Sequence, residues 1–286
     1  MTRKHVKRAR RLPQVVLTDR DREILKLVSG FGVITRPLLQ IALSWSCVSD
    51  INRRLRKLVA ARFLDCRPEL HLPGVPPIYR LGKQGVVQLS QQLDIIADII
   101  EHRRRHYHGL SDSLLRHELL VAEFGCRLRH ALMAAPESGL IEWRQADVLP
   151  ALCNPGAGIG DTVLKPDAYA SFHVGQIRIN GFLEADCGTE SLRRISEKVA
   201  QYRIFKEDGL FAERFRAKAF RLLILTLSER RAENIRRQLK ETPGVKTFIT
   251  NIAAITTDLL FAPVWFLLDG SNSHQPQSLV SGIGRL

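Results

Sequence analysis

The stretch from Leu164 to Tyr202 constrains the fold of this chain more than any other part of it. It reads as a strand up to Phe172, a turn, a second strand that ends at Asp186, and a helix that carries Lys198. Acidic residues stand at the start of the first strand and at the end of the second. In a chain with a net charge of +14, carboxylates gathered at strand ends indicate a functional site.

Three of these acids are placed so that they can share one cation. Asp167 begins the first strand, and Glu184 and Asp186 end the second, two residues apart and therefore on the same side. If the strands are neighbours, the three carboxylates converge, and they repel each other unless a cation lies between them. Mg²⁺, or Mn²⁺ in its place, suits such a set because it takes oxygen ligands and keeps several waters. The sequence therefore predicts a metal site of Asp167, Glu184 and Asp186 that can activate water for phosphate hydrolysis.

A structural role for the same acids is the alternative. Glu184 can form an ion pair with Lys198, and Asp186 can cap the helix that begins near Thr189.

The overall charge indicates a polyanionic partner. The pI is near 10.1, and a basic arm occupies residues 1–14. Nucleic acid is the commonest such partner. A membrane is excluded as a partner because no apolar run approaches the ~18–20 residues that cross a bilayer and the arm has no apolar face. The cysteines are odd in number and scattered, with no CxxC pair, which favours a reducing cytoplasm over a disulfide framework or a zinc cluster.

Residues 18–81 have the pattern of a winged helix-turn-helix. Two short helices are expected over 18–43 and a third over 48–62, followed by a hairpin with a Pro/Gly-rich tip. The third helix has an apolar seam and a basic opposite face, as a helix in a DNA major groove requires. The predicted contacts to double-stranded DNA are Ser49, Asn52, Arg53, Arg56, Lys57 and Arg80, with Lys4, Lys7 and Arg8 of the arm. The alternative is a small helical domain for protein contacts, including contacts in a homodimer.

The expected fold class is α/β (α+β mixed), in two domains. A further helix over 83–101 ends the first domain, and the second has the order helix, three strands, helix, strand, around a mixed central sheet. The predicted segments are a disordered arm at 1–14, the winged helix at 15–102, a basic linker at 103–112, a nuclease-like domain at 113–270 and a flexible tail at 271–286.

Pro166-Asp167, followed after a gap by Glu184-Ala185-Asp186 within that order of elements, resembles the PD-(D/E)xK nuclease superfamily, which has the restriction-endonuclease-like fold. The resemblance implies that Asp167 and Glu184 hold the metal and that a catalytic lysine stands two residues after the glutamate. Asp186 occupies that position here. Lys198 is the best replacement and Lys165 a poorer one, while Glu118 or Glu123 on the preceding helix could add a ligand.

From about residue 18 to residue 268 the chain is similar to the replication-relaxation proteins of bacterial plasmids and integrative elements. The resemblance implies DNA processing for a mobile element, with plasmid replication or transfer proteins as partners. Two functions remain open. One is a Mg²⁺-dependent DNA endonuclease or nickase, with Asp167, Glu184 and Lys198 as catalytic residues. The other is a non-catalytic transcriptional or relaxosome accessory factor with a degenerate nuclease fold.

Overall fold

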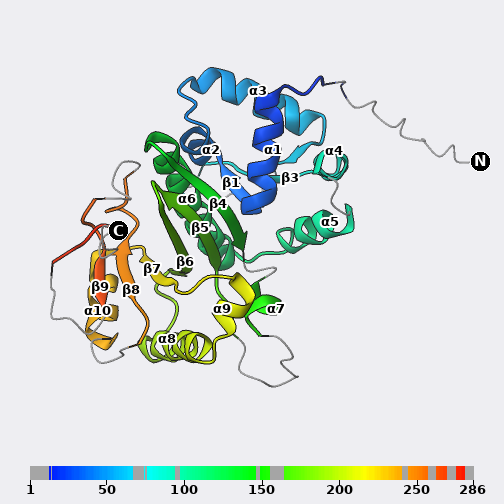
Figure 1. The fold of residues 1–286 in the computed structure, drawn as a ribbon. Coiled ribbons are helices and arrows are strands. Elements are labelled where there is room, and N and C mark those ends of the chain that lie inside the picture. Colours follow the sequence, from blue (N-terminus) through cyan, green and yellow to red (C-terminus); the bar gives the residue numbers. More distant parts are fainter. Residues whose placement is uncertain are drawn as a thin grey trace, which may run out of the picture. The chain divides into compact units, whose positions relative to one another are not determined.

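The computed structural model of the chain describes residues 13, 15–66, 74, 76–93, 97–145, 149–154, 164–239, 244–256, 262–268 and 275–280. By its internal contacts the chain divides into two compact units (Figure 1). Unit 1 comprises Met1–Arg36 and Ser46–Gly109, and unit 2 comprises Pro37–Trp45 and Leu110–Leu286. None of the helices in the described segments has both the length and the apolar character that a membrane crossing requires.

Unit 1 combines helices with a small antiparallel sheet of strand order β1-β3-β2. Its elements are α1 (Asp19–Phe31), β1 (Val33–Thr35), α3 (Val48–Ala60), β2 (Leu64–Asp65), β3 (Ile78–Leu81), α4 (Lys83–Leu93) and α5 (Ala97–His106). The short helix α2 (Arg36–Ala42) follows β1 and belongs almost entirely to unit 2. This is the predicted order of three helices and a hairpin, and most of the hairpin tip lies outside the described residues.

Helix α3 has the two faces that its sequence predicts. Ile51, Leu55 and Leu58 are fully buried, whereas Arg53 and Arg56 are exposed. Because buried positions recur at helical spacing, the basic side of the helix is left toward solvent. The amphipathic pattern of this helix is therefore confirmed.

The structure differs from the sequence expectation after the hairpin. Two helices, α4 and α5, stand where one helix over 83–101 is expected, and α5 continues through Arg103–His106 into the predicted linker. Glu101 accounts for this extension, since its carboxylate pairs with Arg104 three residues later, with Nε 2.7 Å from Oε2. Basic residues also stabilise the last turn of a helix through its dipole. A run of like charges that suggests a solvated linker is thus stabilised as a helix end.

Asp21 anchors unit 1, and we expect its replacement by alanine to lower the free energy of unfolding by about 3 kcal/mol. Its side chain is fully buried, accepts a hydrogen bond from the Thr18 backbone amide at 2.7 Å and pairs with Arg54 of α3. Removing one partner of such a pair leaves the other charge uncompensated. Chemical denaturation followed by circular dichroism measures the loss. Asp19→Ala is the matched control, because Asp19 is almost fully exposed.

The same pair gives stability a defined pH dependence. Burial alone would raise the pKa of Asp21, but hydrogen bonds from Arg54 and Thr18 lower it below its usual value of 3.8. The contribution is therefore complete above pH 3.8 and is lost as the pH falls through the lowered folded-state pKa. The stability difference between wild type and Asp21→Asn should shrink in that acidic range. A difference that stays constant down to pH 2 would contradict this assignment.

Unit 2 is built on a six-stranded mixed sheet of order β4-β5-β6-β7-β8-β9. Strand β6 pairs in parallel with β7, and β7 with β8, while the other neighbouring pairs are antiparallel. The mixed fold class predicted from the sequence is confirmed. The elements are α6 (Asp112–Ala134), β4 (Ser138–Gln145), α7 (Leu149–Cys153), β5 (Ala168–Val174), β6 (Ile177–Asp186), α8 (Leu192–Glu207), α9 (Leu210–Phe215), β7 (Arg221–Thr226), α10 (Glu229–Leu239), β8 (Thr247–Asn251) and β9 (Phe266–Leu268).

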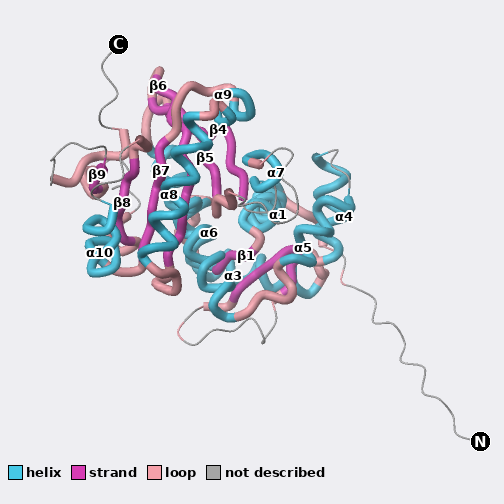
Figure 2. The backbone as a smooth tube through the Cα atoms, turned by 90° about the horizontal axis from the view of Figure 1, so that it is seen from below, coloured by secondary structure: helices cyan, strands magenta, loops and turns pink. Residues whose placement is uncertain are grey.

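Helices cover both faces of this sheet because its central strands are apolar on both sides. Phe124 and Leu183 belong to the core under α6, whereas Phe182 and Tyr202 belong to the core under α8. Neighbouring residues of β6 thus pack against opposite layers, as strand geometry requires. Figure 2 shows α8 lying against the strands of the sheet.

Part of the predicted flexible tail is packed. Within residues 275–280, Gln277 pairs with Trp265 through their backbones, and Leu279 is fully buried. The guanidinium of Arg221 donates a hydrogen bond to the carbonyl oxygen of Leu279. The polar composition of the tail predicts a loose segment, but these contacts pack residues 275–280 against the rest of unit 2. The prediction of a flexible tail is therefore wrong for residues 275–280. The predicted disordered arm at 1–14 lies outside the described residues, apart from Pro13.

Candidate functional site

The strand ends bring two of the predicted acids face to face. Ala168 of β5 pairs with Leu183 of β6, so the antiparallel register sets Asp167 opposite Glu184. The backbone amide of Asp167 donates to the carbonyl oxygen of Leu183 at 3.2 Å and fixes this alignment. Opposite residues in an antiparallel pair have neighbouring side chains. The predicted convergence of Asp167 and Glu184 is thus present.

Glu184 is buried and makes two charge-stabilising contacts with α8. Lys198 Nζ lies 2.9 Å from Oε2, and the Tyr202 hydroxyl donates to Oε1 at 2.5 Å. Burial, with the negative charge of Asp167 adding to it, raises the pKa of Glu184 to about 7, although Lys198 and Tyr202 oppose the shift. A buried carboxylate beside another one is unfavourable unless a positive charge lies close by, and Lys198 provides that charge here.

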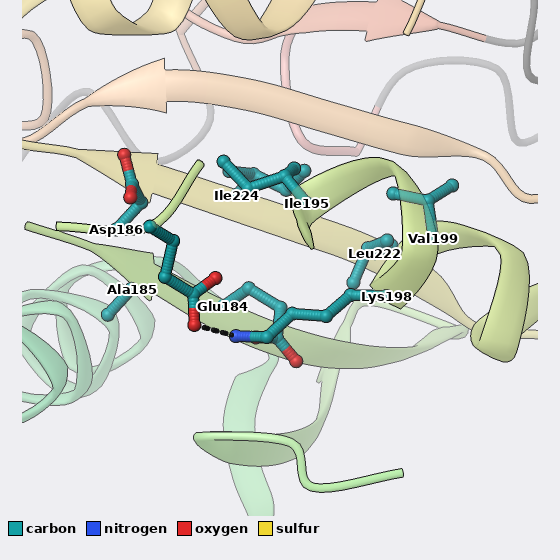
Figure 3. A pocket seen from close by; sticks show the side chains of 9 residues that line it. Glu184, Ala185, Asp186, Ile195, Lys198, Val199, Leu222 and Ile224 are labelled. Atoms are coloured by element: carbon teal, nitrogen blue, oxygen red, sulfur yellow. Dashed lines mark hydrogen bonds and ion pairs between the residues drawn. The ribbon is translucent and has the colours of Figure 1, made fainter. Parts of the chain in front are cut away.

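Lys198 brings an amine to the acids from a helix rather than from β6. Figure 3 shows its side chain reaching from α8 toward Glu184. Its Nζ also lies 2.9 Å from Oε1 of Glu190, in the segment that joins β6 to α8. Burial alone would lower the pKa of Lys198, but Glu184 and Asp167 raise it above its usual value, so the amine is charged. The alternative lysine, Lys165, is exposed.

Asp167 is held by two donors that meet the same oxygen. The amide of Ala185 donates to Oδ2 at 2.7 Å, and His117 Nε2 lies 3.0 Å from Oδ2. Only the aspartate was predicted from sequence. His117 comes from α6, where helical periodicity shows a polar position but gives no indication of its partner.

His117 is a cation that lies between two carboxylates. Its Nδ1 lies 3.6 Å from Oε1 of Glu118, the buried acid next to it on α6. Burial alone would lower the pKa of His117, but Asp167 and Glu118 raise it to about 10. Glu118, proposed from the sequence as an added ligand, therefore neighbours the histidine. Glu123, the other suggested ligand, pairs with Arg127 at 3.1 Å.

Asp186 has a different partner from the one its spacing suggests. Its carboxylate is bound by Arg231 of α10, with Nε 2.6 Å from Oδ2 and Nη2 3.2 Å from Oδ1. Arg231 also donates to the carbonyl oxygen of Glu190 at 2.5 Å. The Asp186 carboxylate lies away from the contact of Lys198 with Glu184 (Figure 3). Asp186 thus tethers the β6–α8 connection to α10, and the cap of α8 is Ser191 instead.

A cavity of about 260 Å³ opens beside these groups. Its lining combines charged and hydroxyl side chains of unit 2, namely Ser113, His117, Asp167, Asp186, Thr189, Glu190 and Lys198. Within the described residues, no group of three or more His, Cys, Asp and Glu side chains is arranged to hold a metal ion. Asp167, Glu184 and Asp186 thus do not form the predicted three-acid group, since Asp186 is bound by Arg231 while Asp167 lies opposite Glu184.

The residues predicted to contact DNA differ in how exposed they are to solvent. Ser49, Arg53, Arg56 and Lys57 are exposed on α3, and Asn52 is half-buried there. Arg80 is only 1% exposed and donates to the carbonyl oxygen of Tyr107 at 3.3 Å. Because residues of α1 and α5 surround its side chain, Arg80 is enclosed within unit 1 and does not form part of an exposed surface. Lys4, Lys7 and Arg8 lie outside the described residues.

Comparison with known proteins gives one match. A family model described as Replication-relaxation matches residues 25–217, which include most of unit 1 and the strands and helix that carry the acids and Lys198. A search of the curated proteins gave no match, and neither did a search of the solved structures.

Proposed function

The chain belongs to the replication-relaxation family, and we propose that it is a DNA-binding protein whose second unit nicks DNA in a Mg²⁺-dependent reaction. Membership indicates a role in the replication or relaxation of plasmids or other mobile elements. The observation that carries the proposal is the arrangement of Asp167 opposite Glu184, with the Lys198 amine 2.9 Å from Glu184. Two paired acids can hold a catalytic metal ion, and a lysine beside them can stabilise negative charge that develops on a phosphate.

The residues present fit one Mg²⁺ ion. Asp167 and Glu184 provide two carboxylates, and Mg²⁺ in proteins is typically bound by one or two carboxylates with water and phosphate oxygens completing its octahedron. The raised pKa of Glu184 reflects burial first and then the negative charge of Asp167, and a cation between the two carboxylates would relieve their repulsion. The adjoining cavity of about 260 Å³ has room for the water molecules. Asp186 does not join this ligand set, because it is committed to Arg231.

The chain's own residues would then have separate tasks. A bound ion would lower the pKa of a water molecule and neutralise charge on the phosphate. Lys198 would hold a positive charge next to the phosphate oxygen on which negative charge develops. Tyr202 keeps Glu184 in place through its hydroxyl. The exposed basic face of α3 would bring the duplex to the protein, with most of its affinity arising from phosphate contacts.

Cleavage of supercoiled plasmid tests this proposal. Wild type should convert supercoiled plasmid to the nicked form in Mg²⁺ or Mn²⁺ and not in EDTA. Asp167→Ala and Glu184→Ala should each lower the rate by at least ~10³-fold, because each removes a metal ligand. Glu142→Ala is the matched control, since this acid lies on the same sheet and pairs with Arg144. Retained DNA binding with no nicking by wild type in either metal would overturn the proposal.

One observation favours the non-catalytic alternative. Each predicted acid already has a cationic partner from the chain, with His117 at Asp167, Lys198 at Glu184 and Arg231 at Asp186. Internal cations of this kind can replace a metal ion in a site that has lost its activity. An accessory factor of this type would bind DNA with the same salt dependence, and it would leave the plasmid supercoiled in either metal.

A further inference from the structure

We infer that His117 is a positioning residue, which orients the Asp167 carboxylate so that one of its oxygens faces the proposed Mg²⁺ ion. This inference rests on the proposed function. The ring approaches the carboxylate from α6, a helix separate from the strands that carry the acids. Nothing in the sequence spacing assigns this role.

The argument begins with how the Asp167 oxygens are used. His117 Nε2 and the Ala185 amide both meet Oδ2, at 3.0 and 2.7 Å. Among the described residues, neither a hydrogen bond nor an ion pair to Asp167 uses Oδ1. Two donors at one oxygen fix the plane of a carboxylate, and the second oxygen remains for a ligand. Metal-binding carboxylates are commonly held in this way by hydrogen bonds from neighbouring groups.

The histidine is itself held in position. Its side chain is 23% exposed, its Nδ1 lies 3.6 Å from Glu118 Oε1, and it lines the cavity beside the acids. Helix α6 is fixed at its start by the Ser111 cap and along its length by the core under the sheet. The ring makes its close contact through Nε2, whereas Nδ1 forms no hydrogen bond and has only the Glu118 carboxylate nearby. Turning the ring away from Asp167 would lose the Nε2 contact. His117 therefore limits the orientations of the aspartate in the free protein.

Binding of Mn²⁺ without DNA tests this role. Electron paramagnetic resonance of free Mn²⁺ gives the dissociation constant of the metal in the full-length protein. His117→Ala should weaken binding by about 10–100-fold, the usual effect of losing a hydrogen-bond partner of a metal ligand. His117→Gln should recover most of the affinity, because its side-chain amide can donate to Oδ2. His173→Asn is the matched control, since His173 lies toward the far end of β5 from Asp167.

The outcomes separate the inference from the proposed function. Mn²⁺ binding that is lost in Asp167→Ala, weakened in His117→Ala and recovered in His117→Gln supports the inference. Binding that is lost in Asp167→Ala but equal to wild type in His117→Ala overturns the inference alone. Equal weakening in the Ala and Gln variants, with unchanged melting temperatures, also overturns it, because rescue by a donor is its specific consequence. Wild-type protein that binds no Mn²⁺ overturns both the inference and the proposed function.

Discussion

Lys198→Met should slow the nicking of DNA by about 10²–10³-fold while leaving Mn²⁺ affinity unchanged or tighter. Methionine keeps most of the length of the side chain and removes the charge, so the packing of α8 on the sheet is preserved. The lost rate is the usual effect of removing one preorganised donor from developing negative charge. Metal affinity does not fall because Lys198 competes with a cation for Glu184, whose Oε2 lies 2.9 Å from the amine.

Single-turnover cleavage of a plasmid measures this effect without interference from product release. Lys206→Met is the matched control, because Lys206 lies on the same helix and donates to the Gly244 carbonyl oxygen, away from the acids. Cleavage by Lys198→Met at the wild-type rate would show that another cation serves the reaction. Loss of both cleavage and metal binding would instead point to a collapsed site, which a lowered melting temperature would reveal.

The triple variant Arg53→Ala, Arg56→Ala, Lys57→Ala should bind duplex DNA about 10²–10³-fold more weakly at 0.1 M salt. Each phosphate contact contributes a slope of about −0.9 to the dependence of log affinity on log salt concentration. Three lost contacts therefore make the slope less steep by about 2.7. Over the tenfold range from 1 M to 0.1 M salt, this difference amounts to a roughly 500-fold loss of affinity for the variant. All three side chains are exposed on α3, so their loss leaves the core of unit 1 intact.

Fluorescence anisotropy at several salt concentrations measures both the affinity and the slope. The control variant replaces Arg22, Lys26 and Arg105 of unit 1 by alanine, which removes the same charge from α1 and α5. If α3 is the DNA-contacting helix, the control retains most of the affinity. Equal losses in the two variants would mean that net charge matters and that no particular face of unit 1 binds DNA.

Local patterns predicted most of the elements because the local and the tertiary forces agree there. At the start of α1, Thr18 accepts a hydrogen bond from the Asp21 amide in a capping box, which is a purely local pattern. The apolar seam of α3 was likewise visible from its spacing and is buried. The acids at the ends of β5 and β6 were expected to meet, and the antiparallel register aligns Asp167 with Glu184.

The partners of these groups could not be predicted because they come from other elements. Asp186 stands two residues after Glu184 and shares its side of the strand, but Arg231 of α10 determines its contacts. His117 meets Asp167 only because α6 packs across the sheet. Arg80 is basic and follows the hairpin tip, and only the packing of α1 and α5 around its side chain shows that it is enclosed.

The most direct measurement is a crystal structure of the protein soaked in MnCl₂, with the metal located by its anomalous scattering. The proposed function predicts one Mn²⁺ ion that is coordinated by both Asp167 and Glu184. It also predicts that Lys198 moves away from Glu184 and that Asp186 stays paired with Arg231. Asp167 and Glu184 without bound metal at saturating Mn²⁺, with Lys198 still paired with Glu184, would contradict it.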